Sequence, residues 1–346
     1  MSGNLMQYSG LLTKTRAMEG CLLSKDELQQ MTELATVNEA INFLKNTRAY
    51  GIIFQGRDEV WHRGQAEAVI VNSLYQDFEK LYRFADAKQR QSFIYILFRY
   101  EINILKLCLK QLFQTNKQGN DVFIDDFFYK HVRFSMDKVE KASTLQEFEQ
   151  SLQGTIYEKA FMQMHKSNGM SYVDYAMGLD IYFYTSVFKS IKRMKRSELK
   201  EILLEIYGTQ IDWLNIMWIY RSKRFYGQTQ AELVAATIPY VYRLKKEELK
   251  ALLNASELSE LNKILENTGY FKGKDAYVQM EDEISYHKIM DSMYKRVCRK
   301  HGVSIAPVLG YLYRKEQEIG RLTTILEGIR YQLPAGEIKD LILITV

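Results

Sequence analysis

The stretch Thr36–Tyr50, TVNEAINFLKNTRAY, recurs twice along the chain and decides how the fold is organised. Similar segments are TLQEFEQSLQGTIY at residues 144–157 and ELSELNKILENTGY at residues 257–270. In each copy a Glu is followed eight positions later by a Thr and, within three more positions, by a Tyr. These pairs are Thr47 with Tyr50, Thr155 with Tyr157, and Thr268 with Tyr270. Self-similarity at a fixed period indicates a repeat architecture, here with units of about 110 residues.

A second set of residues repeats with the same period. Glu101, Asp212 and Glu318 each stand directly before an apolar series that continues in steps of three residues. Such steps place side chains on one face of a helix. Two independent marks at one period predict three tandem helical units, namely residues 1–128 including an N-terminal helix, residues 129–238, and residues 239–346.

The composition favours long helices over a fold with many turns. Of 346 residues, 47% are hydrophobic, and only 3 Pro and 19 Gly accompany them. Between residues 92 and 113 the polar side chains of Arg99, Asn103, Lys106 and Lys110 form one stripe on an otherwise apolar helix. The sequence therefore predicts an all-α protein built from helical bundles. The matching stripe of the second unit is largely apolar, so its helix is predicted to be the most deeply packed of the three.

Charge, cysteine content and hydropathy narrow the setting in which the chain works. Lys and Arg total 47 against 42 Asp and Glu, and a net charge of +5 is too small to indicate nucleic-acid binding. Cys21, Cys108 and Cys298 lie far apart, which favours free thiols in a reducing compartment. Neither a signal peptide nor a run of 18 uncharged apolar residues occurs. We therefore expect a cytoplasmic protein that does not itself span a membrane.

Motifs for catalysis and cofactor binding are absent from the sequence. Neither a Walker A nor a G-x-G-x-x-G string occurs, and H-E-x-x-H and G-x-S-x-G are missing as well. His301 with Cys298 supplies at most two metal ligands, which do not close a tetrahedral site. Asp125-Asp126 resembles the aspartate-rich motif of all-α terpene and prenyl enzymes, but Tyr129 stands where that motif needs a further acid. The sequence thus predicts no catalytic, cofactor-binding or metal site and no small-molecule substrate.

Two basic clusters are the candidates for a partner interface. The first comprises Lys192, Arg193, Lys195 and Arg196, and the second comprises Arg221, Lys223 and Arg224. Basic helix ends bind phosphates, lipid headgroups or acidic partners. The alternative is that these cations lie in solvent and stabilise the negative end of a helix dipole. Both interpretations stay open at this point.

Several segments in a fixed order resemble one protein family. They are YSGLLTKTRAMEGCLL at residues 8–23, the three Thr-to-Tyr helix ends TRAY, TIY and TGY, IDWLNIMWIYRSKRFYG at residues 211–227, and KEQEIGRLTTILEGIRYQLPAGEI at residues 315–338. Together they look like the C/d-subunit family of A/V-type rotary ATPases. The resemblance covers essentially the whole chain.

Membership of that family implies a funnel of three similar helical bundles around a pseudo-threefold axis. It implies a non-catalytic central-stalk subunit, present in one copy, on the cytoplasmic mouth of the membrane proteolipid ring. There the subunit receives the foot of the rotating shaft, so that ATP-linked rotation is coupled to proton or sodium transport. The alternative that the repeats allow is a generic helical-repeat scaffold or adaptor, and an all-α enzyme with a central cavity is a third possibility.

Overall fold

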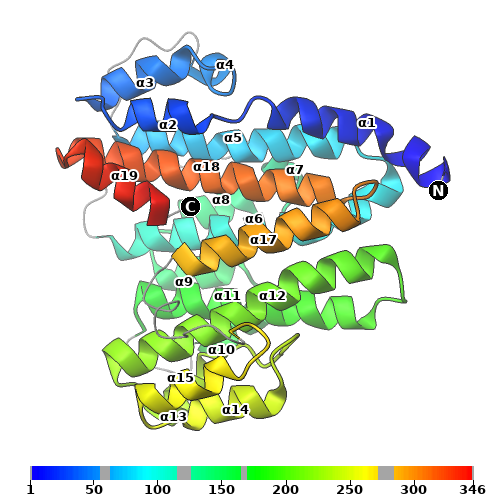
Figure 1. The fold of residues 1–346 in the computed structure, drawn as a ribbon, viewed down its shortest axis with the longest axis vertical. Helices are drawn as coiled ribbons and strands as arrows, with labels where there is room; N and C mark the ends of the chain where they lie inside the picture. The colour runs from blue at the N-terminus through cyan, green and yellow to red at the C-terminus, as the bar shows by residue number, and fades with distance from the viewer. Residues whose placement is uncertain (1, 55–62, 115–125, 165–169, 272–283, 345–346) are drawn as a thin grey trace. The chain divides into compact units, whose positions relative to one another are not determined.

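The described part of the chain is entirely helical. The computed structural model describes residues 2–54, 63–114, 126–164, 170–271 and 284–344, and within these ranges it contains no β-strand. The predicted all-α class is therefore confirmed (Figure 1). No helix in the same ranges combines the length and the apolarity that crossing a bilayer requires.

The chain divides into two compact units, which we call the terminal unit and the middle unit. The terminal unit comprises residues 1–94, 114–132 and 301–346. Its helices are α1 (Ser2–Glu19), α2 (Lys25–Met31), α3 (Val37–Lys45), α4 (Gly51–Phe54), α5 (Arg63–Phe84), the start of α6 (Ala87–Phe113), α7 (Asp126–His131), α18 (Ala306–Arg330) and α19 (Ala335–Ile344). The long helices α1, α5 and α18 pack side by side in this unit (Figure 1).

The middle unit comprises residues 95–113 and 133–300. It contains the rest of α6, α8 (Met136–Lys141), α9 (Leu145–Ser151), α10 (Glu158–Met164), α11 (Tyr172–Arg193), α12 (Glu198–Arg221), the π-helix η1 (Ser222–Tyr226), α13 (Gln230–Ala235), α14 (Lys246–Asn254), α15 (Leu258–Glu266) and α17 (Ile284–Lys300). Helices α11 and α17 both pack against α12, which forms the centre of this unit. The division of the chain into three sequence units stays a prediction.

The order of the helices repeats three times along the chain. Two short helices come first, in the pairs α2–α3, α8–α9 and α14–α15. Each pair is followed by two long helices, α5–α6, α11–α12 and α17–α18. The recurring Thr and Tyr residues lie just after the second short helix, and the recurring acids lie in the second long helix.

The recurring Glu and Thr residues begin and end the second short helix of each repeat. Thr36 and Thr144 accept the N–H of Glu39 and Glu147, each at 3.2 Å, as N-cap residues. Those two glutamates and Glu260 reach back to accept a backbone N–H before the helix, at 3.0, 2.8 and 2.9 Å. At the other end the hydroxyls of Thr47, Thr155 and Thr268 donate to the carbonyl three residues earlier, at 2.7, 2.6 and 2.6 Å. The sequence repeat therefore encodes a helix with defined ends.

The long helices α12 and α18 are buried to a similar extent. The buried positions number 15 of 24 residues in α12 and 15 of 25 in α18. The buried fraction of α12 is thus slightly the higher, as predicted for the helix of the second repeat, but α18 comes close to it. The reason is that α18 packs against α1, α3, α5 and α19, so its polar residues are enclosed as well.

Two glycines in neighbouring helices provide a matched test of packing. A Cβ on Gly208 would lie 2.5 Å from Cγ and 2.7 Å from Cβ of Tyr242, whereas on Gly178 it would meet the flexible end of Met164. Both sites would gain about 1 kcal/mol in helix propensity on substitution by Ala. We expect Gly208→Ala to lower the free energy of unfolding by about 1–2 kcal/mol because Tyr242 must shift. Gly178→Ala should leave it unchanged or raise it, as urea denaturation followed by circular dichroism would measure.

Candidate functional site

The three recurring tyrosines meet the three recurring acids in the folded protein. The hydroxyl of Tyr50 donates to Oε1 of Glu318 at 2.8 Å. The hydroxyl of Tyr157 donates to Oε2 of Glu101 at 2.5 Å, and that of Tyr270 donates to Oδ2 of Asp212 at 2.7 Å. We call these three pairs the tyrosine–carboxylate nodes. One lies within the terminal unit and two lie within the middle unit.

Each node joins one repeat to another. Tyr157 of the second repeat contacts the acid of the first, and Tyr270 of the third contacts the acid of the second. Tyr50 of the first repeat contacts Glu318 of the third, so the same pairing joins the two ends of the chain within the terminal unit. The repeat marks are therefore the residues that hold the repeats together.

A backbone N–H donates to the same carboxylate in every node. The donors are Leu23, Arg133 and Arg243, at 2.5, 2.7 and 2.7 Å from Glu318, Glu101 and Asp212 respectively. All three donors precede a short helix pair and lie 27, 24 and 27 residues before the recurring tyrosine. Each carboxylate thus ties two points of one repeat to the long helix of another.

The node at Glu318 contains a buried lysine. The ammonium of Lys315 donates to Oε1 of Glu318 at 2.8 Å and to the hydroxyl of Tyr50 at 2.7 Å. The side chains of Lys315 and Glu318 are 3% and 5% exposed. The ammonium also lies 4.1 Å from the centroid of the Tyr50 ring, a cation–π distance. A buried charge needs such a complete set of partners, because an unpaired one is costly.

The node at Glu101 takes its positive charge from a different element. Nε of Arg133 donates to Oε2 of Glu101 at 2.9 Å, and Nη2 donates to the same oxygen at 2.5 Å. The guanidinium lies 4.4 Å from the ring centroid of Phe98, which occupies the position of Lys315 in the first repeat. An arginine from outside the long helix therefore replaces the lysine within it.

The node at Asp212 is satisfied by the backbone. The N–H groups of Tyr242 and Leu244 donate at 2.9 and 3.0 Å, in addition to the donors from Arg243 and Tyr270. The guanidinium of Arg243 instead lies 3.5 Å from Glu205. Burial raises the pKa of Asp212, against the opposing effect of these hydrogen bonds. Trp213 packs beside the node, 5.3 Å from Phe271 between ring centroids.

The sequence identified the recurring tyrosines and acids but not the groups that complete the nodes. Lys315 carried a usable signal, because a Lys and a Glu three residues apart both fall on the apolar face of one helix. Arg133 and the backbone donors carried none, since they lie on segments distant in sequence from the acids they contact. Tyr311, whose hydroxyl donates to Asp77 at 2.6 Å, was also missed.

Because the node tyrosines are buried, we expect the folded protein to lose stability at alkaline pH. Burial first, and then the adjacent carboxylate, raise the pKa of Tyr50, Tyr157 and Tyr270 well above 10. Above pH 10 the unfolded chain loses these protons while the folded chain keeps them. The free energy of unfolding should therefore fall as pH rises, by about 1.4 kcal/mol per pH unit for each such tyrosine.

Urea denaturation between pH 9 and 11 measures this slope, and tyrosinate absorbance reports when each group ionises. Tyr157→Phe should make the fall of the unfolding free energy with pH less steep, by about 1.4 kcal/mol per pH unit, the contribution of one tyrosine. Tyr226→Phe is the matched control, because Tyr226 is 73% exposed and belongs to none of the nodes. A slope that all three proteins share would contradict the assignment.

The two predicted basic clusters lie at opposite ends of α12. Lys192 and Arg193 end α11, and Lys195 and Arg196 precede α12; all four are exposed. Arg221 is the last residue of α12, and Lys223 and Arg224 lie in η1. A helix of 24 residues is about 36 Å long, so the clusters do not form one surface.

The second cluster is tied into the fold more closely than the first. The ammonium of Lys223 donates to the carbonyls of Leu253 and Ala255, at 3.1 and 2.5 Å, and so caps the end of α14. The guanidinium of Arg224 donates to the hydroxyl of Tyr220 at 3.3 Å and lies 5.1 Å from the ring centroid of Phe225. Lys223 thus has a structural role, whereas Arg224 is held among aromatic rings.

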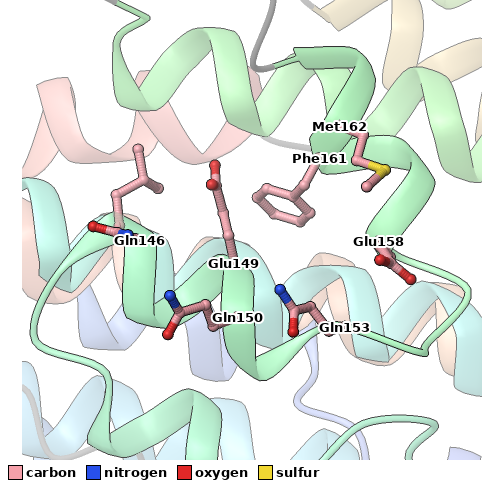
Figure 2. A pocket seen from close by; sticks show the side chains of 8 residues that line it. Gln146, Glu149, Gln150, Gln153, Glu158, Phe161 and Met162 are labelled. Carbon is pink, nitrogen blue, oxygen red and sulfur yellow. The ribbon is translucent and has the colours of Figure 1, made fainter.

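An open groove of about 700 Å³ lies between α9 and α10 in the middle unit. Figure 2 shows the side chains of Gln146, Glu149 and Gln150 from α9, with Phe161 facing them from α10. Glu149 takes the helix position that the buried Ile41 has in α3, since Thr36 and Thr144 cap the two helices alike. A lining that combines amide and carboxylate groups with the apolar side chains of Leu145, Phe161 and Met162 suits a polar protein contact.

The structure also places the residues that were considered for metal binding. In the described ranges, no group of three or more His, Cys, Asp or Glu side chains is arranged to hold a metal ion. Asp126 begins α7, while Asp125 lies outside the described residues. His301 is buried and its Cys298 neighbour is half-buried.

Comparison with known proteins identifies the class to which this repeat architecture belongs. The family described as ATP synthase (C/AC39) subunit matches residues 11–341. The chain belongs to this family, which confirms the resemblance seen in the sequence.

Curated relatives, each named as the C-subunit of an A-type ATP synthase, extend over nearly the whole chain. The protein from Methanobrevibacter smithii is 25% identical over 95% of this chain and 86% of its own length. That from Archaeoglobus fulgidus is 22% identical over 97% of this chain and 96% of its own length. That from Methanocaldococcus jannaschii is 21% identical over 98% of this chain and 87% of its own length.

Proposed function

We propose that this chain is the non-catalytic central-stalk subunit of a V/A-type ATPase. In this role it joins the rotating shaft to the proteolipid ring of the membrane rotor, on the cytoplasmic side, and couples ATP turnover to proton or sodium transport. Family membership and the name shared by the relatives support a place in such a complex. One copy per complex, arranged as a funnel around a pseudo-threefold axis, follows from the same proposal.

The observation that carries the mechanical part of the proposal is the closing node at Tyr50 and Glu318. A part that transmits torque between two partners has to resist shear between its own segments. The three nodes oppose such shear, because each fixes the Tyr and the backbone of one repeat to the long helix of another. Buried, fully hydrogen-bonded polar groups rigidify a structure and specify one arrangement. The node of the terminal unit extends this cross-link to the two ends of the chain.

The candidates for contacts with shaft and ring within this proposal are exposed or half-exposed cations at the two ends of α12, and either end alone could supply them. Lys192, Arg193, Lys195 and Arg196 flank its beginning, and Arg221 and Arg224 flank its end. Charged rims of this kind steer association and fix its register. Lys223 donates to the backbone at the end of α14, so its role in this proposal is to hold the neighbouring residues in place.

Affinity purification from detergent-solubilised membranes of the host tests the proposal. We expect the tagged protein to co-purify with a proteolipid and with shaft subunits, identified by mass. Reversing the charge of Arg221 and Arg224 together should reduce that recovery while leaving the circular dichroism spectrum unchanged. A monomer that recovers no membrane partner at low salt would favour the scaffold alternative instead.

A further inference from the structure

The end of α12 is shaped differently from an ordinary helix terminus. Residues 222–226 form the π-helix η1, and the chain then leaves it through Gly227 at φ 55°, whose N–H donates to the carbonyl of Ser222 at 3.0 Å. The hydroxyl of Ser222 donates to Oε1 of Gln228 at 2.6 Å. π-Helical turns are rare and occur frequently at functional sites. The turn is therefore a fixed local structure that sets the direction of the side chains it carries.

Two aromatic side chains of this turn are exposed to solvent. Phe225 is 65% exposed and Tyr226 is 73% exposed, and Val234 on the following helix α13 is 51% exposed. The rings of Phe225 and Tyr226 lie 6.5 Å apart at 69° to each other. Aromatic residues are enriched in protein interfaces and among the residues that dominate binding energy. We call Arg221, Arg224, Phe225 and Tyr226 the aromatic tip.

The charge of the aromatic tip has one sign. From Arg221 to Ala231 the sequence contains three cations and no acidic residue. The first acid beyond it, Glu232, accepts the N–H and the hydroxyl of Thr229, each at 2.8 Å, and so serves the cap of α13. Arg224 is held in place by the rings of Tyr220 and Phe225, which reduces the entropy that binding would cost. A partner that complements this surface must be acidic.

A similar arrangement ends α18 in the terminal unit. Arg330 lies 5.8 Å from the ring centroid of Tyr331, which is 62% exposed. The next residue, Gln332, leaves the helix at φ 55°, as Gly227 does. An arginine beside an exposed aromatic ring before a left-handed residue thus occurs at the ends of both helices. This recurrence argues that the aromatic tip is a feature of the repeat and not an accident of one loop.

The other basic cluster lacks an exposed aromatic side chain, since the ring of Phe188, which lies 5.2 Å from the ammonium of Lys192, is buried. Lys192, Arg193, Lys195 and Arg196 are exposed, but no large apolar side chain among residues 189–200, all of them described, is exposed. Lys200 caps the end of α11 through the carbonyls of Lys192 and Met194, at 3.1 and 2.7 Å. Cations at the carboxyl end of α11 are stabilised by the helix dipole and by water, without a partner protein. Charge alone does not distinguish the two clusters, whereas the aromatic residues do.

We propose that the aromatic tip, and not the cluster at residues 192–196, is the surface that binds an acidic protein partner, namely an Asp- and Glu-rich segment of a neighbouring subunit. This rests on the proposed function, which places the chain in a complex. The guanidinium groups pair with carboxylates of the segment, and Phe225 and Tyr226 exclude water around those pairs. Such aromatic and arginine anchors make ion pairs more effective than exposed pairs alone.

Photocrosslinking in the intact complex identifies the occupant. A benzoylphenylalanine replaces Tyr226 in one variant and Lys195 in a second, and each complex is irradiated after purification in detergent. We expect the first to yield a crosslink to a subunit peptide rich in Asp and Glu, and the second to yield at most a trace. A crosslink from position 226 to lipid, to a basic or apolar peptide, or to nothing would overturn the proposal.

Retention of the subunit on the complex provides a second and independent readout. The double variant Phe225→Ser with Tyr226→Ser should lower affinity by about thirtyfold, the effect of losing a hot spot. Lys195→Gln with Arg196→Gln should change it by less than threefold, and both pairs are exposed, so both proteins should fold. Loss of binding in the second variant only would overturn the assignment to the aromatic tip while leaving the proposed function intact. Failure of the wild-type chain to join any complex would instead overturn the proposed function.

Discussion

Replacing Lys315 by Met should lower the free energy of unfolding by about 3–5 kcal/mol. The substitution keeps an apolar stem of similar length but removes the charge that faces Glu318 at 2.8 Å, and both side chains are almost completely buried. A buried carboxylate left without its cation cannot be solvated, which explains the size of the penalty. Tyr50 also loses the donor to its hydroxyl, at 2.7 Å. Urea denaturation measures the loss, and hydrogen exchange should locate it in the terminal unit.

An exposed pair with the same spacing serves as the control for Lys315. Lys245 lies 3.6 Å from Glu248, also three residues apart, but its side chain is 76% exposed. Lys245→Met should therefore cost less than about 1 kcal/mol. Lys315→Met combined with Glu318→Gln should cost less than the sum of the two single changes, because neither charge is then left alone. Equal small effects of Lys315→Met and Lys245→Met would mean that water reaches the node.

The sequence alone predicted the parts of this fold that depend on local pattern. Helical class follows from apolar periodicity and from the scarcity of Pro and Gly, and both are properties of short windows. The second short helix of each repeat was also readable, because its Thr and Glu residues act within four positions of their partners. Local hydrogen bonds leave a local signature, and three copies made that signature visible.

The nodes could be predicted only in part, because their contacts join distant segments. Tyr50 and Glu318 each stood out as repeat marks, yet nothing in the sequence shows that the tyrosine of one repeat meets the acid of another. The sequence also left open which charge completes each node, since Lys315 lies on the same helix as its acid while Arg133 lies on another segment. In the second repeat backbone N–H groups satisfy the carboxylate of Asp212. Because nearly every residue carries such a donor, the sequence does not show which of them do so.

The exposed cations and aromatic side chains at the ends of α12 could be predicted less well than the helices. The cations at residues 192–196 and 221–224 were found by composition, but their separation by the length of α12 depends on where helices begin and end. Phe225 and Tyr226 are exposed, although most large aromatic side chains bury their apolar surface in the core. Contact with water does not stabilise the apolar surface of either ring. Two adjacent exposed rings are therefore the observation that indicates a binding partner.

Replacing Asp212 by Leu should cost about 4 kcal/mol, although no side-chain cation pairs with this acid in its node. The carboxylate accepts the N–H groups of Tyr242, Arg243 and Leu244 and the hydroxyl of Tyr270, at 2.7–3.0 Å. Leucine accepts none of them, and each donor that stays buried without a partner costs about 1–3 kcal/mol, with part of the total recovered where water enters. Tyr270→Phe removes one donor together with its bond and should cost only about 1 kcal/mol.

Asp212→Asn separates the hydrogen bonds of this node from its charge. Burial raises the pKa of Asp212 in the folded protein above its ordinary 3.8, so ionisation is harder in the folded chain than in the unfolded one. Relative to Asp212→Asn, the wild-type free energy of unfolding should therefore fall as pH rises from about 4 through that raised pKa. The amide keeps one acceptor oxygen, so its cost at pH 7 should lie between those of Tyr270→Phe and Asp212→Leu. If the asparagine variant instead matched the leucine variant at every pH, the charge and not the set of acceptors would hold the second and third repeats together.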